Sequence, residues 1–111
     1  MESTTEQAAV FAALADPTRL KLLKLLSQSR EFNALCVNAL AGMLEVSQSA
    51  VSQHLRVLKS VGLVSGKRMG YHIHYSVNPE AFKKCQEMIS SMTNLSQSQD
   101  ESKEEKNVPG A

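Results

Sequence analysis

The sequence has few aromatic residues and no tryptophan. Of its 111 residues only 5% are aromatic, whereas 42% are hydrophobic, so a core must be built mostly from Leu, Val, Ala and Met. A chain of this length suits one domain of ordinary size, about 100–150 residues. Such a domain has little room for a deep cofactor cleft together with a catalytic apparatus.

Long hydrophobic runs and cysteine pairs are also scarce. The longest uninterrupted apolar run is the eight residues Ala8–Ala15, far short of the ~20 that a membrane-spanning helix needs. No basic segment precedes an apolar one at the start of the chain, so no secretory signal is visible. Two cysteines, Cys36 and Cys85, do not make a disulfide framework. These absences predict a protein without a membrane partner that works in the reducing cytoplasm.

Acidic residues are missing from one long stretch. The whole chain has a net charge of only +1, but no Asp or Glu occurs between Val46 and Pro79, where the bases are Arg56, Lys59, Lys67 and Arg68. Residues 95–111 hold four acids, two lysines and almost no apolar side chains, so we expect a disordered polar tail there. Residues 1–94 then form the folded domain, with a net charge of +3. A basic surface without acids suits a phosphate backbone, although an ordinary solvated face has the same composition.

Helical periodicity fills the first half of the chain. Apolar residues at helical spacing predict a short helix over 8–14 and a leucine-rich one, expected inside the domain, that begins at Pro17 with Asp16 as its N-cap. A third helix is expected to begin near Leu35 to Val37. The first half of the chain is therefore expected to be all helical.

A helix-turn-helix is predicted next. The four residues Leu44–Ser47 form a tight turn, and Ser47 is expected to cap a fourth helix of about three turns that Gly62 closes. Its apolar stripe recurs at i, i+4 and i+7, as Val51, Leu55 and Leu58. Two short helices joined by such a turn match the motif in size and order.

The remaining pattern is a hairpin followed by one more helix. The run His72–Val77 alternates, and Gly70 lies at the turn that precedes it, which is typical of a β-hairpin. Asn78 and Pro79 start a last helix, whose apolar stripe is Phe82, Cys85, Ile89 and Met92. The predicted fold is mainly α with a β-hairpin: a winged helix-turn-helix in the order helix, helix, helix, helix, strand, strand, helix.

This arrangement suits double-stranded DNA. The exposed face of the fourth helix carries side chains that donate and accept hydrogen bonds with base edges, namely Gln48, Ser49, Ser52 and Gln53. Arg56 is expected to reach a phosphate or a guanine. The hairpin tip offers Lys67, Arg68 and Tyr71 to the backbone or minor groove. His54 lies beside the apolar stripe, and we interpret it as a half-buried hydrogen-bonding residue.

These motifs resemble the ArsR/SmtB family of bacterial and archaeal repressors. The resemblance is carried by residues 13–20, by residues 35–41 and by the run from Ser47 through Leu58 to Val64 and Tyr75. It implies a homodimer built from the first and last helices that occupies a palindromic operator, represses transcription and leaves when an inducer binds. It implies DNA recognition through the four fourth-helix residues just listed.

The inducer stays open. Soft-metal sensors of this family carry a Cys-Val-Cys-Asp element, of whose three potential ligands only the first cysteine remains here, as Cys36, because Asn38 and Ala39 replace the other two. The Asp and His residues that zinc sensors use on the last helix are absent as well. Cys36 and Cys85 are candidate sensor thiols for a soft metal or metalloid or for reversible oxidation, and inert packing explains them equally well. The spacing of His72 and His74 on one strand face is a weaker metal signal.

Enzyme classes find little support. No glycine-rich phosphate loop occurs, and no histidine has a nucleophile and an acid at motif spacing. We therefore expect no enzymatic activity. A winged helix that mediates only protein contacts is the rival interpretation.

Overall fold

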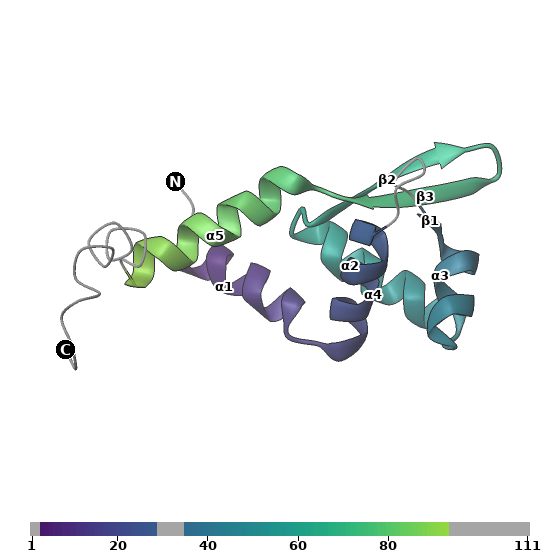
Figure 1. Ribbon diagram of the computed structural model, residues 1–111, viewed down its shortest axis with the longest axis horizontal. Helices are drawn as coiled ribbons and strands as arrows, with labels where there is room; N and C mark the ends of the chain where they lie inside the picture. The colour runs from purple at the N-terminus through teal and green to yellow at the C-terminus, as the bar shows by residue number, and fades with distance from the viewer. Residues whose placement is uncertain (1–2, 29–34, 94–111) are drawn as a thin grey trace, which may run out of the picture. The chain divides into compact units, whose positions relative to one another are not determined.

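The computed structural model describes residues 3–28 and 35–93, and the chain forms two compact units, Met1–Pro79 and Glu80–Ala111. The elements are α1 (Thr4–Leu14), α2 (Pro17–Gln28), β1 (Leu35–Cys36), α3 (Val37–Leu44), α4 (Gln48–Ser60), β2 (Val64–Met69), β3 (His72–Val77) and α5 (Pro79–Thr93) (Figure 1). This order confirms the predicted winged helix-turn-helix. The boundary expected at residue 94 and the tail expected over 95–111 lie outside the described residues.

Side-chain caps begin the first two helices. The Ser3 hydroxyl accepts a hydrogen bond from the Glu6 backbone N–H at 3.1 Å, and the Glu6 carboxylate accepts one from the Ser3 N–H at 3.0 Å. Asp16 Oδ2 accepts from the Arg19 N–H at 3.0 Å, with Pro17 as the first residue of α2. Each cap satisfies a backbone donor that has no partner inside its helix, and the predicted start of α2 is confirmed.

Helix α2 lies at the centre of the first unit. It packs against α1, α3, α4 and β3 and buries Leu22, Leu23 and Leu26. Leu20 is an exception to the expectation of an interior helix, because it is 45% exposed. Since each fully buried leucine contributes about 1.5–3 kcal/mol relative to an exposed one, α2 anchors the core on which the helix-turn-helix rests.

The turn between α3 and α4 is closed at both ends. The Val46 N–H donates to the Ala41 carbonyl at 3.2 Å and the Glu45 N–H to the Gly42 carbonyl at 3.4 Å, and Glu45 takes the left-handed conformation with φ +56°. Ser47 Oγ then accepts from the Ala50 N–H at 3.0 Å. These bonds satisfy the last carbonyls of α3 and a first donor of α4, so the angle between the two helices is fixed locally.

Helix α4 is amphipathic and ends at a glycine, as predicted. The stripe Val51, Leu55 and Leu58 is at most 1% exposed. At the other end Gly62 has φ +80°, and the Leu63 N–H donates to the Leu58 carbonyl at 3.0 Å. Only a residue that tolerates positive φ closes a helix in this way without strain, and the closure leads directly into β2.

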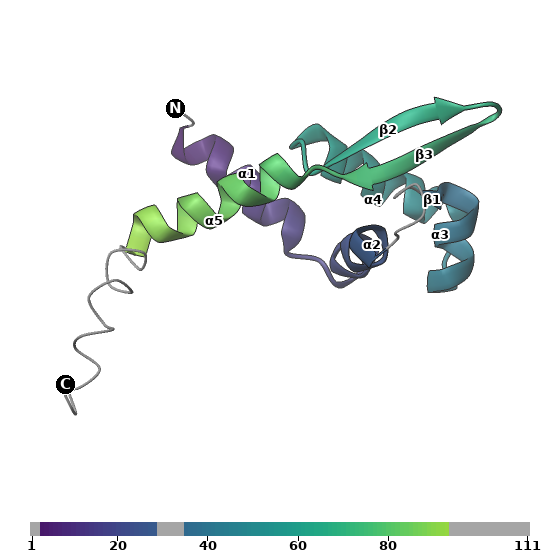
Figure 2. The same ribbon diagram turned by 45° about the horizontal axis from the view of Figure 1, so that its top comes forward.

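The hairpin belongs to a three-stranded antiparallel sheet, in the order β1-β3-β2. Strands β2 and β3 pair from Val64↔Val77 to Met69↔His72, which leaves a two-residue turn whose first residue, Gly70, has φ +69°. The tip of this hairpin lies apart from α3 and α4 in both views (Figures 1 and 2). The short strand β1 was not expected. Its residues Leu35 and Cys36 pair with Tyr75 and His74, and the third helix begins directly after it at Val37, within the predicted range.

Helix α5 forms the described part of the second unit. It begins at Pro79, as predicted, and buries Cys85 and Met88. Of the expected apolar stripe, Ile89 is 42% and Met92 is 63% exposed. Among residues 3–28 and 35–93, no helix has the length and apolar character required to cross a membrane.

The Ser47 cap generates a stability prediction. We expect Ser47→Ala to lower the free energy of unfolding by about 1 kcal/mol, because the Ala50 N–H loses its acceptor. The matched control is Ser49→Ala, an exposed position two residues further on, where the change should stay within about 0.5 kcal/mol. Urea unfolding followed by circular dichroism at one protein concentration measures both. Equal effects of the two substitutions would contradict the cap's role.

Candidate nucleic-acid interface

The residues predicted to touch DNA are all exposed. They come from two elements, α4 and the β2–β3 hairpin: Gln48, Ser49, Ser52, Gln53, Arg56, Lys67, Arg68 and Tyr71. Both elements belong to the same compact unit and are joined by the short Val61–Leu63 connection. One continuous segment of chain, residues 48–71, therefore presents all eight side chains.

The polar face of α4 follows from the burial of its opposite face. Because the apolar stripe turns inward, Ser49, Ser52 and Gln53 are turned to solvent in the first half of the helix. Hydroxyl and amide groups both donate and accept, which matches the mixed pattern of base edges in the major groove. Arg56 lies one turn after Ser52 and is also exposed. The face can therefore read bases at its start and bind phosphate further along.

The hairpin distributes its bases over both of its faces. Lys67 pairs with His74 and Arg68 pairs with Ile73, and neighbouring residues of a strand point to opposite faces. Tyr71 at the turn is 97% exposed. The base of the hairpin is held to the end of α4, because the Asn78 side-chain amide donates to the Gly62 carbonyl at 3.0 Å. The wing thus carries a cation on each side of an anchored ribbon.

Gly66 is the narrow point of this ribbon. A Cβ at this position would lie 2.9 Å from Ile73 Cγ2 and 3.0 Å from Tyr75 Cε1, closer than side-chain atoms normally approach. The Tyr75 ring and the Ile73 methyl group therefore lie over the glycine, and the absence of a side chain at Gly66 lets the two strands pack in this register.

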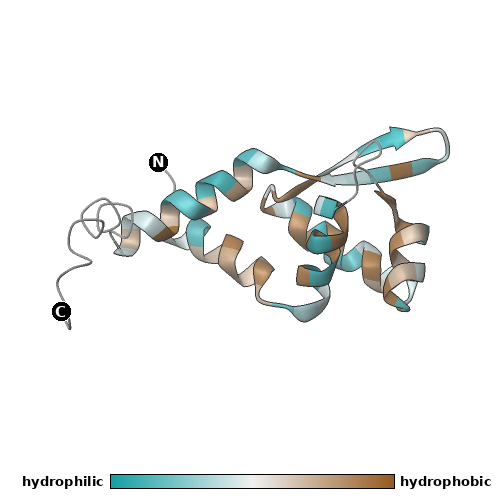
Figure 3. Cartoon of the chain, in the orientation of Figure 1, coloured by the Kyte–Doolittle hydropathy of each residue, from teal (hydrophilic) through white to brown (hydrophobic). Residues whose placement is uncertain are grey.

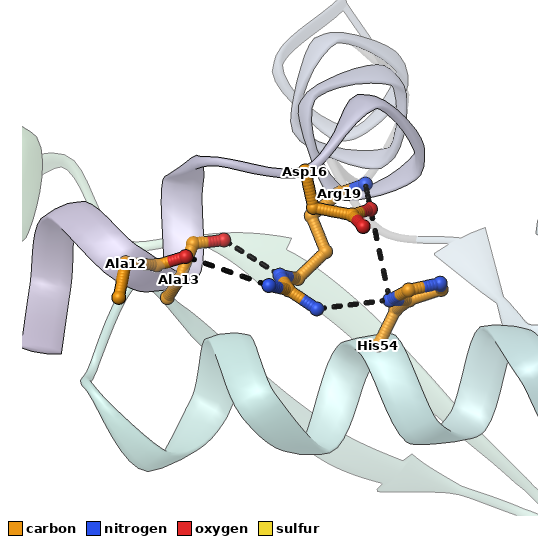
Figure 4. Close-up of polar contacts among 5 residues, drawn as sticks. All are labelled: Ala12, Ala13, Asp16, Arg19 and His54. Atoms are coloured by element: carbon orange, nitrogen blue, oxygen red, sulfur yellow. Dashed lines mark hydrogen bonds and ion pairs between the residues drawn. The ribbon is translucent and has the colours of Figure 1, made fainter.

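A polar cluster joins α4 to the corner between α1 and α2 (Figure 4). Arg19 Nε donates to the Ala13 carbonyl at 2.6 Å, and Arg19 Nη1 lies 3.2 Å from His54 Nδ1. Asp16 Oδ2 lies 3.9 Å from the same ring nitrogen. The side chains of His54 and Asp16 are 24% and 29% exposed, which confirms His54 as a half-buried hydrogen-bonding residue. Sequence reasoning assigned no role to Arg19, because its partners are 6 and 35 residues away in the chain.

The surroundings of Asp16 stabilise its negative charge. Its pKa is lowered from the ordinary value of 3.8, first because its carboxylate accepts the Arg19 backbone hydrogen bond and further because the Arg19 guanidinium and His54 lie nearby. Asp16 is therefore ionised at neutral pH, and it faces the Arg19–His54 contact as a fixed negative charge.

The candidate thiols occupy different environments. Cys36 is half-buried in β1, where its register partner is His74, and Cys85 is buried in α5. Cross-strand partners share a sheet face, so Cys36 and His74 lie on the face that also carries Lys67 and His72. In the part of the chain that the structure describes, no three His, Cys, Asp or Glu side chains are grouped to hold a metal ion.

Sequence comparisons match this architecture. The family model described as "Bacterial regulatory protein, arsR family" matches residues 16–65. A Synechocystis protein named transcriptional repressor SmtB homolog is 42% identical over 77 residues, which cover 69% of this chain and 55% of that protein. A Staphylococcus aureus protein named cadmium resistance transcriptional regulatory protein CadC homolog is 36% identical over 86 residues, which cover 78% of this chain and 69% of that protein. The chain thus matches only about half the length of the first relative.

A solved structure agrees with the fold. The winged helix-turn-helix DNA-binding domain of Mb0332 from Mycobacterium bovis, described as homodimeric and as a possible ArsR-family regulator, superposes with a TM-score of 0.62 at 28% identity. The superposition covers 87% of this chain and 83% of that one. The present chain therefore has the same winged helix-turn-helix fold as that domain.

Proposed function

The chain belongs to the arsR family of bacterial regulatory proteins, and we propose that it is a homodimeric repressor that binds a palindromic operator and leaves it when an inducer binds. The relatives named above are transcriptional regulators, in agreement with the expectation that this chain is not an enzyme. The observation that carries the proposal is the exposed polar face of α4 within a stretch that lacks acids.

Recognition is divided between the helix and the wing in this proposal. Gln48, Ser49, Ser52 and Gln53 contact base edges in the major groove, and Arg56 contacts phosphate or guanine. Lys67 and Arg68 neutralise phosphates, and Tyr71 meets the backbone or the minor groove. Phosphate contacts supply most of the affinity, whereas base contacts supply the sequence preference. Because the partner is operator DNA, we place the protein in the cytoplasm.

The exposed apolar surfaces of α1 and α5 support a homodimer. In α1 only Ala13 is buried, although the helix is mostly hydrophobic after its first turn (Figure 3). In α5, Ile89 and Met92 are exposed. Large exposed apolar side chains on a helix face commonly mark an interface, and the related Mb0332 domain is described as homodimeric. We assign residues 1–94 to this DNA-binding and dimerisation domain.

We assign inducer chemistry to Cys36 rather than to Cys85. Cys36 is half-buried, whereas Cys85 is 7% exposed. Cys36 also immediately precedes α3 and pairs with the wing strand β3, so a group bound to its thiol would disturb both parts of the DNA-binding surface. A relative is named for cadmium resistance, and thiolates are preferred ligands of such soft ions. A metalloid, a soft metal and an oxidant are the three candidate inducers.

The first test separates affinity from specificity. Duplexes selected by the protein from a pool with a randomised centre should contain an inverted repeat with half-sites about one helical turn apart. Gln53→Ala should relax the preference for the selected duplex by about 1–3 kcal/mol. Arg68→Ala should weaken selected and random duplexes alike and reduce the salt slope of binding by about 1. Fluorescence anisotropy over a range of salt concentrations measures these quantities.

Two results would contradict this division. If the affinity were independent of salt, the winged helix would serve protein contacts rather than DNA. If Gln53→Ala weakened random and selected duplexes equally, base reading would not depend on this face of α4.

The dimer is tested on α5. Ile89→Glu should shift the protein from dimer to monomer in sedimentation experiments, because a carboxylate cannot be buried in an apolar interface without a partner. Ser91→Glu adds the same charge on a different side of the helix and should leave the dimer intact. If both variants or neither dissociated, the exposed stripe of α5 would not be the dimer contact.

The inducer assignment is tested with the selected duplex. Arsenite, Cd²⁺, peroxide and polysulfide are added in turn to the wild type, Cys36→Ser and Cys85→Ala. We expect at least one reagent to release the wild type and Cys85→Ala but not Cys36→Ser, and the identity of that reagent distinguishes metal or metalloid binding from oxidation. Release that persists in Cys36→Ser would remove this thiol from the mechanism.

A further inference from the structure

We propose that Arg19 and His54 are positioning residues for DNA recognition, forming a tether that orients α4 only while His54 is neutral. This inference rests on the proposed function and adds to it a residue pair outside the DNA-contacting face. Its consequence is an operator affinity that depends on the protonation of a residue that does not itself touch DNA.

The guanidinium of Arg19 is fixed before it reaches α4. Its Nε donates to the Ala13 carbonyl at 2.6 Å, and Nη2 lies 3.5 Å from the Ala12 carbonyl (Figure 4). Both carbonyls belong to the last turn of α1, where carbonyl groups lack partners within the helix. Its own backbone N–H donates to Asp16. The side chain therefore bridges the end of α1 and the start of α2, and Nη1 is left to meet His54.

The contact with His54 fixes the rotation of α4 about its axis, which apolar packing alone does not. The buried stripe of α4 attracts the core in proportion to area, and this attraction is not directional. The hydrogen bond from Arg19 Nη1 to His54 Nδ1, at 3.2 Å, depends on the orientation of the ring. His54 directly follows Ser52 and Gln53, so any rotation of α4 that moves the ring away from Arg19 turns these two side chains by the same angle.

The tether exists in one protonation state. Arginine donates hydrogen bonds and accepts none, so His54 Nδ1 must be the acceptor and the ring proton must lie on Nε2. A proton on Nδ1 would place two donors and two positive charges at this short distance. Asp16 Oδ2, at 3.9 Å from Nδ1, would then be the acceptor that remains. When His54 is protonated, its ring therefore loses Arg19 as a partner and binds Asp16 instead. The movement of the ring shifts α4.

Protonation of the other two histidines is expected to strengthen DNA binding rather than weaken it. His72 and His74 lie on the wing, where protonation adds positive charge near the phosphates and strengthens binding to any sequence. Loss of the tether instead weakens the preference for one sequence. The ratio of the affinities for selected and random duplexes separates the two effects.

The experiment uses the full chain with His72→Gln and His74→Gln as its background. In this background the ratio of affinities for the selected and random duplexes should fall roughly tenfold when the pH is lowered from about 7.5 to about 5.5. His54→Asn places an amide oxygen near the position of Nδ1 and should keep the high ratio at both pH values. His54→Leu should give the low ratio at both. Thermal unfolding of each variant shows that it is folded.

Three results would overturn the proposal. The first is a pH-dependent ratio that persists in His54→Asn, and the second is a ratio in the background protein that does not change with pH. The third needs no DNA: long-range ¹H–¹⁵N spectra of the free protein near neutral pH should show His54 as the Nε2–H tautomer, and the Nδ1–H tautomer would exclude the tether. Should no duplex be selected at all, the proposed function fails, and the spectra still decide on the tether.

Discussion

The proposed DNA-binding surface depends on the burial of one face of α4. Val51, Leu55 and Leu58 are removed from water by the core that α2 organises, and this leaves the opposite face of the helix in solvent. The Ser47 cap and the Gly62 closure fix where the helix begins and ends. With the ends and one face determined, helical geometry leaves Ser49, Ser52 and Gln53 on the solvent side of α4. No separate interaction is needed to expose them.

The wing depends on the same helix through its C-terminal end. The Leu63 N–H bonds back to Leu58, and the Asn78 N–H donates to the Leu63 carbonyl at 2.9 Å. Strand β2 therefore begins, and strand β3 ends, beside the residues that close α4. The hydrogen-bonded register then carries Lys67 and Arg68 to opposite faces. The hydrogen bonds at Leu63 therefore connect the two elements proposed to contact DNA, α4 and the wing.

Much of this architecture was predictable from local signals. Capping residues, the i, i+4, i+7 stripe and the glycine turns each act within one or two turns of chain, and all the predicted helices and the hairpin are present. Strand β1 was not predictable, because two residues are too short for an alternating pattern and its partner lies about forty residues away. The role of Arg19 was missed for the same reason. Its partners are determined by the packing of the α1–α2 corner on α4. The sequence around a single arginine that follows a capping aspartate does not indicate such distant partners.

The sequence also left open how a helix held by apolar contacts acquires a defined orientation. Hydrophobic burial selects which face turns inward, but small rotations about the helix axis change the buried area little. A short polar contact at the edge of the buried stripe distinguishes such rotations, because its energy falls steeply with angle. In this chain His54 occupies that edge, and Arg19 meets it from a helix whose first turn is capped by Asp16. The residues proposed to read DNA and the residue proposed to orient them are therefore neighbours in sequence but lie on different faces of α4.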